Sequence, residues 1–191
     1  NAGDALGSGT ENVIIGVNAD PNHGTGSAQI VIGQAVTGVG NSNFTFGNGT
    51  SDSNIAFGAD EITAPSDQRY KEDIADATAG LAFIKDLRPV TFKWKKEKDV
   101  PSDHLSYVEG SDKRVMLSNG ETNHGFIAQE VKTAIDNHSE IKDGFRMWSE
   151  QGLDEDGNST GGRQRLGSVA LIPMLVKAIQ ELEARIATLE G

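Results

Sequence analysis

The C-terminal end of the chain carries a heptad repeat of apolar residues, which a single helix cannot bury on its own. The residues follow one another at spacings of 3, 4, 3, 4 and 3, with Ile at every a position and Leu at every d position. They are Ile172, Leu175, Ile179, Leu182, Ile186 and Leu189. The pattern predicts a coiled coil over residues 171–191, formed with other copies of the chain. An amphipathic helix packed on its own domain is the alternative.

The number of strands in this coiled coil follows from two further signals. Ile at a with Leu at d leans towards a parallel dimer in general. The stretch RIATLE instead has the short trimer-specifying pattern, in which Arg185 at g could reach Glu190 at e of a neighbour. We therefore expect a homotrimer. Pro173 removes one backbone donor, so the regular helix is expected to begin near it.

Residues 1–65 carry a second repeat, in which two apolar residues flank any residue and a Gly follows. It appears as VIIG, IVIG, FTFG and IAFG, ending at Gly16, Gly33, Gly47 and Gly58. Each unit predicts a very short strand, and the Gly permits a positive φ at a tight corner. Turn-forming residues separate the units. The repeat predicts a β-solenoid or intertwined β-prism whose coils stack on further coils or on other copies, with a disordered Gly/Ser/Asn linker as the alternative.

Charge divides the chain at the same place. Residues 1–65 hold six acidic residues and no Lys or Arg, whereas all 17 basic residues lie from Arg69 onward. The net charge of -11 disfavours binding to nucleic-acid phosphate. No Cys is present, which excludes disulfides and Cys nucleophiles. No apolar run is long enough to cross a bilayer. Because the chain opens with Asn1, we expect it to be the C-terminal part of a longer protein.

The sequence pattern of residues 66–170 predicts an α+β domain with two long polar arms. Two helices are predicted, over 75–87 and around GFIAQEVKTAI, with a strand at VTFKWK between them. The first polar arm is 95–123, which we interpret as a long loop or an extended hairpin. The second is the polar stretch 142–167, and we interpret both as arms or binding loops. The predicted order is therefore a β repeat segment at 1–65, a domain at 66–170 and a coiled coil at 171–191.

Three stretches together resemble a known family. SDQRYKEDI is similar to the signature Ser-Asp-x-Arg-x-Lys-x-x-Ile that opens the C-terminal intramolecular chaperone domain of bacteriophage tailspikes, tail fibres and endosialidases. GFIAQEV and LIPMLVKAIQEL resemble that family's central helix and terminal coiled coil. The same domain is known as a self-cleaving peptidase. The resemblance covers essentially residues 66–191, and the preceding Gly repeat of residues 1–65 resembles the end of a trimeric β-helical fibre, which this family usually follows.

The resemblance implies a function and a set of site residues. The domain would bring three chains together, template the upstream β segment as its folding client, and cut itself off at the bond between Pro65 and Ser66. Ser66 would be the nucleophile and Lys71 its general base, with Asp67 and Arg69 in positioning roles. The chain would be a tail-fibre or tailspike precursor assembled in the bacterial host cytoplasm, and the cut would release the chaperone part. We expect no cofactor, nucleic-acid or membrane partner.

The chemistry sets conditions on this site. A Ser hydroxyl needs a base, and Lys serves only when it has lost its proton, which desolvation or a positive charge such as Arg69 would favour. Ser66 and Lys71 are five residues apart and would face opposite sides of a straight strand. The site therefore requires a bend between them, or a Lys from another chain. The alternative for Ser66 is an ordinary helix N-cap or turn.

The remaining candidates are weaker. The four His residues show no metal-ligand spacing, although His124 could sit near the active site. The stretch from Asp154 to Ser159 lacks the alternating acids of a calcium loop, so we interpret it as a turn and expect no metal. Two other functions compete with self-cleavage. One is a purely structural trimeric fibre tip, and the other is a receptor-binding knob that uses the polar arms.

Overall fold

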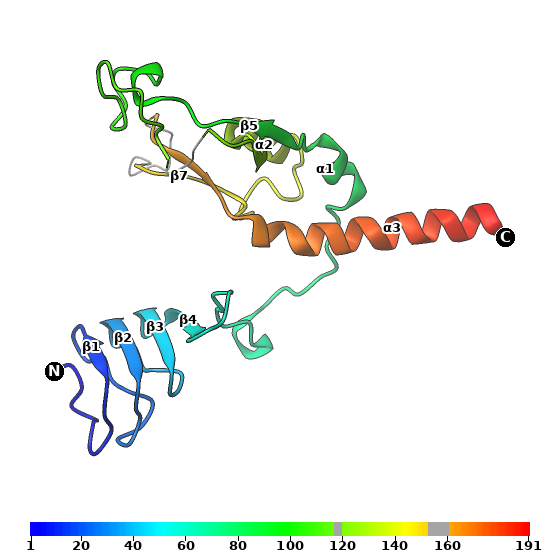
Figure 1. Cartoon of the computed structure of the whole chain (residues 1–191). Coiled ribbons are helices and arrows are strands. Elements are labelled where there is room, and N and C mark those ends of the chain that lie inside the picture. Colours follow the sequence, from blue (N-terminus) through cyan, green and yellow to red (C-terminus); the bar gives the residue numbers. More distant parts are fainter. Residues whose placement is uncertain (117–119, 153–160) are drawn as a thin grey trace. The chain divides into compact units, whose positions relative to one another are not determined.

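The computed structural model describes residues 1–116, 120–152 and 161–191, and the chain forms two compact units (Figure 1). The first unit is Asn1–Ile74 and the second is Ala75–Gly191. The acidic stretch from Asp154 to Ser159, interpreted above as a turn, lies outside the described residues. Each unit has its own apolar core.

The first unit contains one four-stranded sheet in the order β1-β2-β3-β4, which we call the β-stack. The strands are β1 (Val13–Ile15), β2 (Gln29–Gln34), β3 (Asn43–Asn48) and β4 (Ser51–Ala56). The first three pair in parallel and in register, so that Val13, Ile30 and Phe44 lie opposite one another. Side chains alternate across the sheet. On one side Val31, Ala19 and Val36 form a small core with Ile14.

The first three glycines of the repeat lie where the backbone of a neighbouring strand comes close. Gly16, Gly33 and Gly47 have φ values of 126°, 141° and 135°. A Cβ on Gly16 would lie 1.9 Å from the carbonyl oxygen of Gly33, and a Cβ on Gly33 would lie 1.9 Å from that of Gly47. Both the backbone conformation and the spacing therefore require Gly, as the repeat indicates.

The fourth repeat unit does not extend the parallel series. β4 pairs antiparallel with β3, and Ile55 lies opposite Phe44. Only Gly49 and Thr50 connect the two strands, and a connection of two residues can join only antiparallel neighbours. The side chain of Asn48 accepts hydrogen bonds from the backbone N–H groups of Thr50 (3.0 Å) and Ser51 (2.9 Å), which fixes the turn. The solenoid or prism formed by several copies stays a prediction.

The second unit is a mixed α/β domain with two small antiparallel sheets. Its helices are α1 (Leu81–Asp86), α2 (Ala128–Asp136) and α3 (Ile172–Glu190). β5 (Val90–Phe92) pairs with β6 (Asn123–Gly125), and β7 (Trp148–Glu150) pairs with β8 (Gln164–Leu166). The predicted helix over 75–87 is shorter than expected because it begins only after Gly80, a residue of low helix propensity. α2 matches the helix predicted around GFIAQEVKTAI.

The core of the second unit joins all three helices. Phe83 and Met147 are fully buried at its centre, and Val131, Ala134 and Ile135 of α2 pack beside them. The N-terminus of α1 is tied to α3, because the backbone N–H of Leu81 donates to Glu181 Oε2 over 2.9 Å. His138, just after α2, contacts Asp86 Oδ2 through Nε2 (2.8 Å) and Glu140 Oε1 through Nδ1 (3.0 Å).

α3 has two apolar faces. One packs on the domain through Leu171 in the preceding turn and through Met174 and Ala178. The other is the heptad seam, which solvent reaches in the single chain: Ile179 is 65% exposed, and the other five a and d residues are exposed too. The helix begins at Ile172, with Pro173 in its first turn, where a missing N–H costs nothing. The coiled coil and the trimer stay predictions.

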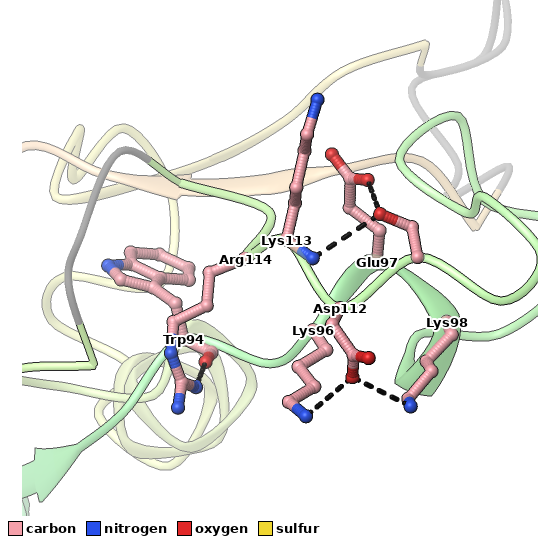
Figure 2. A network of polar contacts seen from close by, with 8 residues as sticks. Trp94, Lys96, Glu97, Lys98, Asp112, Lys113 and Arg114 are labelled. Atoms are coloured by element: carbon pink, nitrogen blue, oxygen red, sulfur yellow. Dashed lines mark hydrogen bonds and ion pairs between the residues drawn. The ribbon is translucent and has the colours of Figure 1, made fainter.

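The first polar arm folds back on itself rather than forming an open loop (Figure 2). Lys96 and Arg114 form a bridge between its two limbs, and Arg114 donates to the carbonyl oxygen of Trp94. Asp112 Oδ1 lies 2.6 Å from Lys96 Nζ and 2.7 Å from Lys98 Nζ, and these two ammonium groups lower the pKa of Asp112 to about 2. The second arm contains the β7–β8 pair. The arms meet where Arg163 donates to Ser106 Oγ over 3.5 Å.

Across the described residues, no helix combines the length and the apolar character that a membrane span requires.

Candidate active site

Ser66 and Lys71 lie in direct contact near the end of the first unit. Lys71 Nζ donates a hydrogen bond to Ser66 Oγ over 2.7 Å. This distance is within the range in which a base can take a proton from a hydroxyl. Both side chains are exposed in the single chain. The nucleophile and the base expected from the sequence therefore meet within one chain, with no contribution from a neighbour.

A single 3-10 turn supplies the bend between them. The turn covers Gln68–Tyr70, and its hydrogen bonds run from Tyr70 N to Asp67 O (3.1 Å) and from Lys71 N to Gln68 O (3.0 Å). It reverses the chain after Ser66 and directs the side chain of Lys71 back onto the hydroxyl. Five residues of straight strand would separate the two groups, whereas this turn joins them.

Asp67 holds the turn in place. Its carboxylate accepts from the backbone N–H of Arg69 (2.9 Å) and forms an ion pair with the Arg69 guanidinium at 2.5 Å. The hydrogen bond from the Arg69 side chain is the main reason that the pKa of Asp67 lies below its ordinary value, and the pKa of Arg69 is raised by the same contact. Arg69 therefore directs its charge to Asp67 and serves as a clamp on the turn.

The bond between Pro65 and Ser66 lies between two fixed points. On its N-terminal side, Thr63 exchanges two backbone hydrogen bonds with Asn54 of β4, at 2.7 and 2.9 Å. On its C-terminal side, the turn at Gln68–Tyr70 holds the chain. Pro65 itself is exposed. The peptide that would be cut is thus presented on the surface, next to the hydroxyl that would attack it.

The other predicted residues fall in the second unit. His124 lies in β6 opposite Thr91. The predicted trimerisation residues all lie on α3, and Arg185 and Glu190 are exposed there with no ion pair within the described residues of the single chain. Within the described ranges, no three His, Asp or Glu side chains gather as a metal site would require.

Two features of the site were not predicted from the sequence. One is the anchoring of Thr63 on β4, for which the sequence gives no local signal. The other is the particular turn at Gln68–Tyr70. Its signal was present, because an Asp two residues before an N–H donor is typical of a side-chain-capped turn.

Comparison with known proteins identifies the domain. Residues 66–140 match the family described as chaperone of endosialidase, Peptidase_S74. The match begins at Ser66 itself and ends four residues after α2. The match supports a C-terminal intramolecular chaperone domain of phage tail proteins in this part of the chain. The family's name is that of a peptidase as well as a chaperone. Comparisons with curated proteins and with solved structures found no match.

Proposed function

We propose that this chain is a self-processing folding chaperone of a phage tail fibre or tailspike. Three copies assemble through α3, the domain templates the β-stack of residues 1–65, and each copy then cuts its own chain between Pro65 and Ser66. The observation that carries this proposal is the 2.7 Å contact between Lys71 Nζ and Ser66 Oγ. It lies at the residue where the family match begins.

The proposed cut proceeds in two steps. Lys71, in its neutral form, takes the proton of Ser66 Oγ while the oxygen attacks the carbonyl carbon of Pro65. The bond from that carbon to the Ser66 nitrogen breaks, the nitrogen receives the proton, and an ester joins Pro65 to Ser66 Oγ. Water then hydrolyses the ester, which leaves a carboxylate on Pro65 and a free amine and hydroxyl on Ser66. Each chain consumes one water and turns over once.

Assembly would control when this happens. In the single chain both reactive side chains are exposed, so water surrounds them. A neighbouring chain that covers the turn would remove this water and favour the neutral amine. We infer that the cut follows assembly and therefore proofreads it. Premature cleavage of a lone chain would be slow for the same reason.

The exposed seam of α3 supports assembly of several copies. A monomer would leave six large aliphatic side chains of one stripe in water, at a cost of roughly 1 kcal/mol or more for each half-exposed residue. The opposite face of the same helix already packs on its own domain. α3 can thus join copies while it stays fixed to the domain that it aligns.

A fibre of wound chains gains from such a device. A slipped β register buries similar side chains, so errors cost little energy, and contacts between chains form slowly. A helix bundle that sets the register removes this degeneracy. Once the template is cut off, the fibre cannot return along its folding route, and its stability becomes kinetic. The host cytoplasm, where tail proteins are made, would be the site of this step.

A time course of the purified chain tests this function. We expect wild type to split into two fragments with first-order kinetics that do not depend on protein concentration once assembly is complete. Ser66→Ala should stay whole, and Lys71→Ala should slow the cut by about 10²- to 10⁴-fold. The matched controls are Ser102→Ala and Lys142→Ala, which alter exposed residues of the second unit and should cut like wild type. Wild-type trimers that stay whole would contradict self-cleavage.

A further inference from the structure

We propose that the outward side of the β-stack is the surface through which copies of this chain meet along the fibre. This outer face consists of six residues, Val13, Ile15, Ile30, Ile32, Phe44 and Phe46. The inference rests on the proposed assembly of several copies, and it assigns the contact surface of the fibre segment, which α3 does not provide.

The outer face is more apolar than the side that is already buried. Val13, Ile15 and Ile32 are exposed, at 47%, 55% and 37%. The inward positions of β2 and β3, by contrast, include Gln29 and Thr45, both fully buried. A sheet that buries polar groups and presents aliphatic ones to water is inverted relative to an ordinary soluble sheet. The inversion is resolved if the outward side is covered in the assembled protein.

In-register pairing arranges these side chains as two straight rows. One row joins Val13, Ile30 and Phe44, and β4 extends it with Ile55. The second row joins Ile15, Ile32 and Phe46. Neighbouring strands of a sheet lie about 4.8 Å apart, so each row is a regular ladder. A second copy of the same stack presents ladders of the same spacing, which a partner of unrelated fold would not.

Charge also favours a second copy. The β-stack segment has six acidic residues and no Lys or Arg, so copies repel each other over most of their surface. The outward positions of all four strands carry no charged residue, because Asp52 of β4 lies opposite Gly47, on the inward side. This face is thus where identical acidic chains can approach without bringing like charges together.

The arms of the chaperone domain fit this face poorly. The first arm presents Lys96, Lys98 and Asp112 as an exposed ionic cluster. Burying those groups against aliphatic ladders would remove their water without supplying a polar partner. The exposed apolar residues of the described first arm, Leu105, Val108 and Met116, lie outside any strand, so they do not form ladders such as those of another stack.

Cysteine cross-linking tests this face, because the natural chain has no Cys. Ile32→Cys is introduced into the full-length Ser66→Ala chain, and Ile15→Cys in a second chain guards against a local folding defect. Asp4→Cys is the control, since Asp4 is exposed and acidic. Light scattering of the same samples reports assembly. Under mild oxidation, we expect both face variants to give covalent dimers and Asp4→Cys to stay uncross-linked.

The possible outcomes are distinct. A trimer in which both face thiols stay uncross-linked and react with a maleimide as fast as Asp4→Cys overturns the assigned face but leaves assembly through α3 intact. Equal cross-linking at all three positions also overturns it, because the contact would then be unspecific. A monomeric chain refutes both the face and the proposed function. If the face variants cross-link but the wild-type chain, which keeps Ser66, never cuts itself, the assigned face is supported and only the self-cleavage is refuted.

Discussion

The amine of Lys71 donates to the hydroxyl of Ser66 over 2.7 Å, and one 3-10 turn separates the two residues. The contact depends on little else, because the segment around it is exposed. The geometry of the contact therefore depends on the turn and not on the apolar core. Residues of the site can thus be substituted without loss of the fold.

The Asp67 clamp should control the rate of the cut without affecting stability. Asp67→Ala removes the acceptor for the Arg69 backbone and side chain, so the turn loosens and Lys71 leaves Ser66. We expect cleavage that is roughly ten- to a hundredfold slower, with unchanged thermal unfolding. Asp67→Asn keeps one acceptor oxygen, so its cleavage rate should lie between those of wild type and Asp67→Ala. A gel time course measures the rate, and wild-type cleavage by Asp67→Ala would show that the clamp has no role.

Two adjacent residues of α3 should separate assembly from folding. Ile179 belongs to the exposed seam, whereas Ala178 is buried against the domain at 4% exposure. Ile179→Asp should abolish trimers and slow the cut while the second unit stays folded. Ala178→Asp buries an unpaired charge and should destabilise the domain by about 3 kcal/mol or more. Light scattering and circular dichroism read the two effects. Trimers of normal stability in Ile179→Asp would contradict the role of the seam.

His138 should make the second unit more stable at mildly acidic pH than at alkaline pH. The hydrogen bond to Asp86 is the main cause that raises the pKa of His138 above its ordinary value of 6.5, and the hydrogen bond to Glu140 is the second. Folding thus favours the protonated form of His138. Its contribution to the stability of the folded unit is fully present below pH 6.5 and is lost as the pH rises through the raised pKa. The melting temperature should therefore fall as the pH rises from 6.5 through the raised pKa of His138.

The control for this effect is His138→Gln, which keeps a polar side chain but cannot take up a proton. Its melting temperature should vary less over the same pH interval than that of wild type. An equally steep decrease in both proteins would assign the pH dependence to other groups.

The glycine ladder should be essential to the β-stack. In Gly33→Ala, the new Cβ would meet the Gly47 carbonyl oxygen at 1.9 Å, at a residue whose φ is 141°. We expect a loss of more than about 2 kcal/mol in the unfolding free energy of the first unit. Gly40→Ala is the matched control, because nothing lies within 4 Å of its added Cβ. Urea unfolding checks both, and equal stability of the two variants would contradict the close approach of the strands.

Some features could be predicted from the sequence because they depend on local pattern. α2 follows from the spacing of Val131, Ala134 and Ile135, and the positive φ values of the repeat glycines follow from the repeat, although Gly33 and Gly47 lie within strands rather than at corners. The need for a bend between Ser66 and Lys71 follows from the alternation of a strand. Each of these signals is contained within a few neighbouring residues.

Other features depend on tertiary contacts and escaped prediction. The seam of α3 was visible, but the second face that packs Met174 and Ala178 was not, because small or flexible residues give a weak periodic signal. The β7–β8 pair lies within a polar stretch, where its alternation is masked by residues such as Glu150 and Arg165. The fourth Gly repeat was expected to form a further coil of a solenoid or prism, whereas the short turn at Gly49 and Thr50 makes β4 antiparallel to β3.

The mass of the assembled protein tests the central claim most directly. After incubation as a trimer, the wild-type chain should give two species by intact mass spectrometry, residues 1–65 and residues 66–191, and the second should begin SDQRYK. Ser66→Ala should give only the uncut mass. An intact wild-type trimer, a new terminus at any other residue, or the same cut in Ser66→Ala would contradict the account.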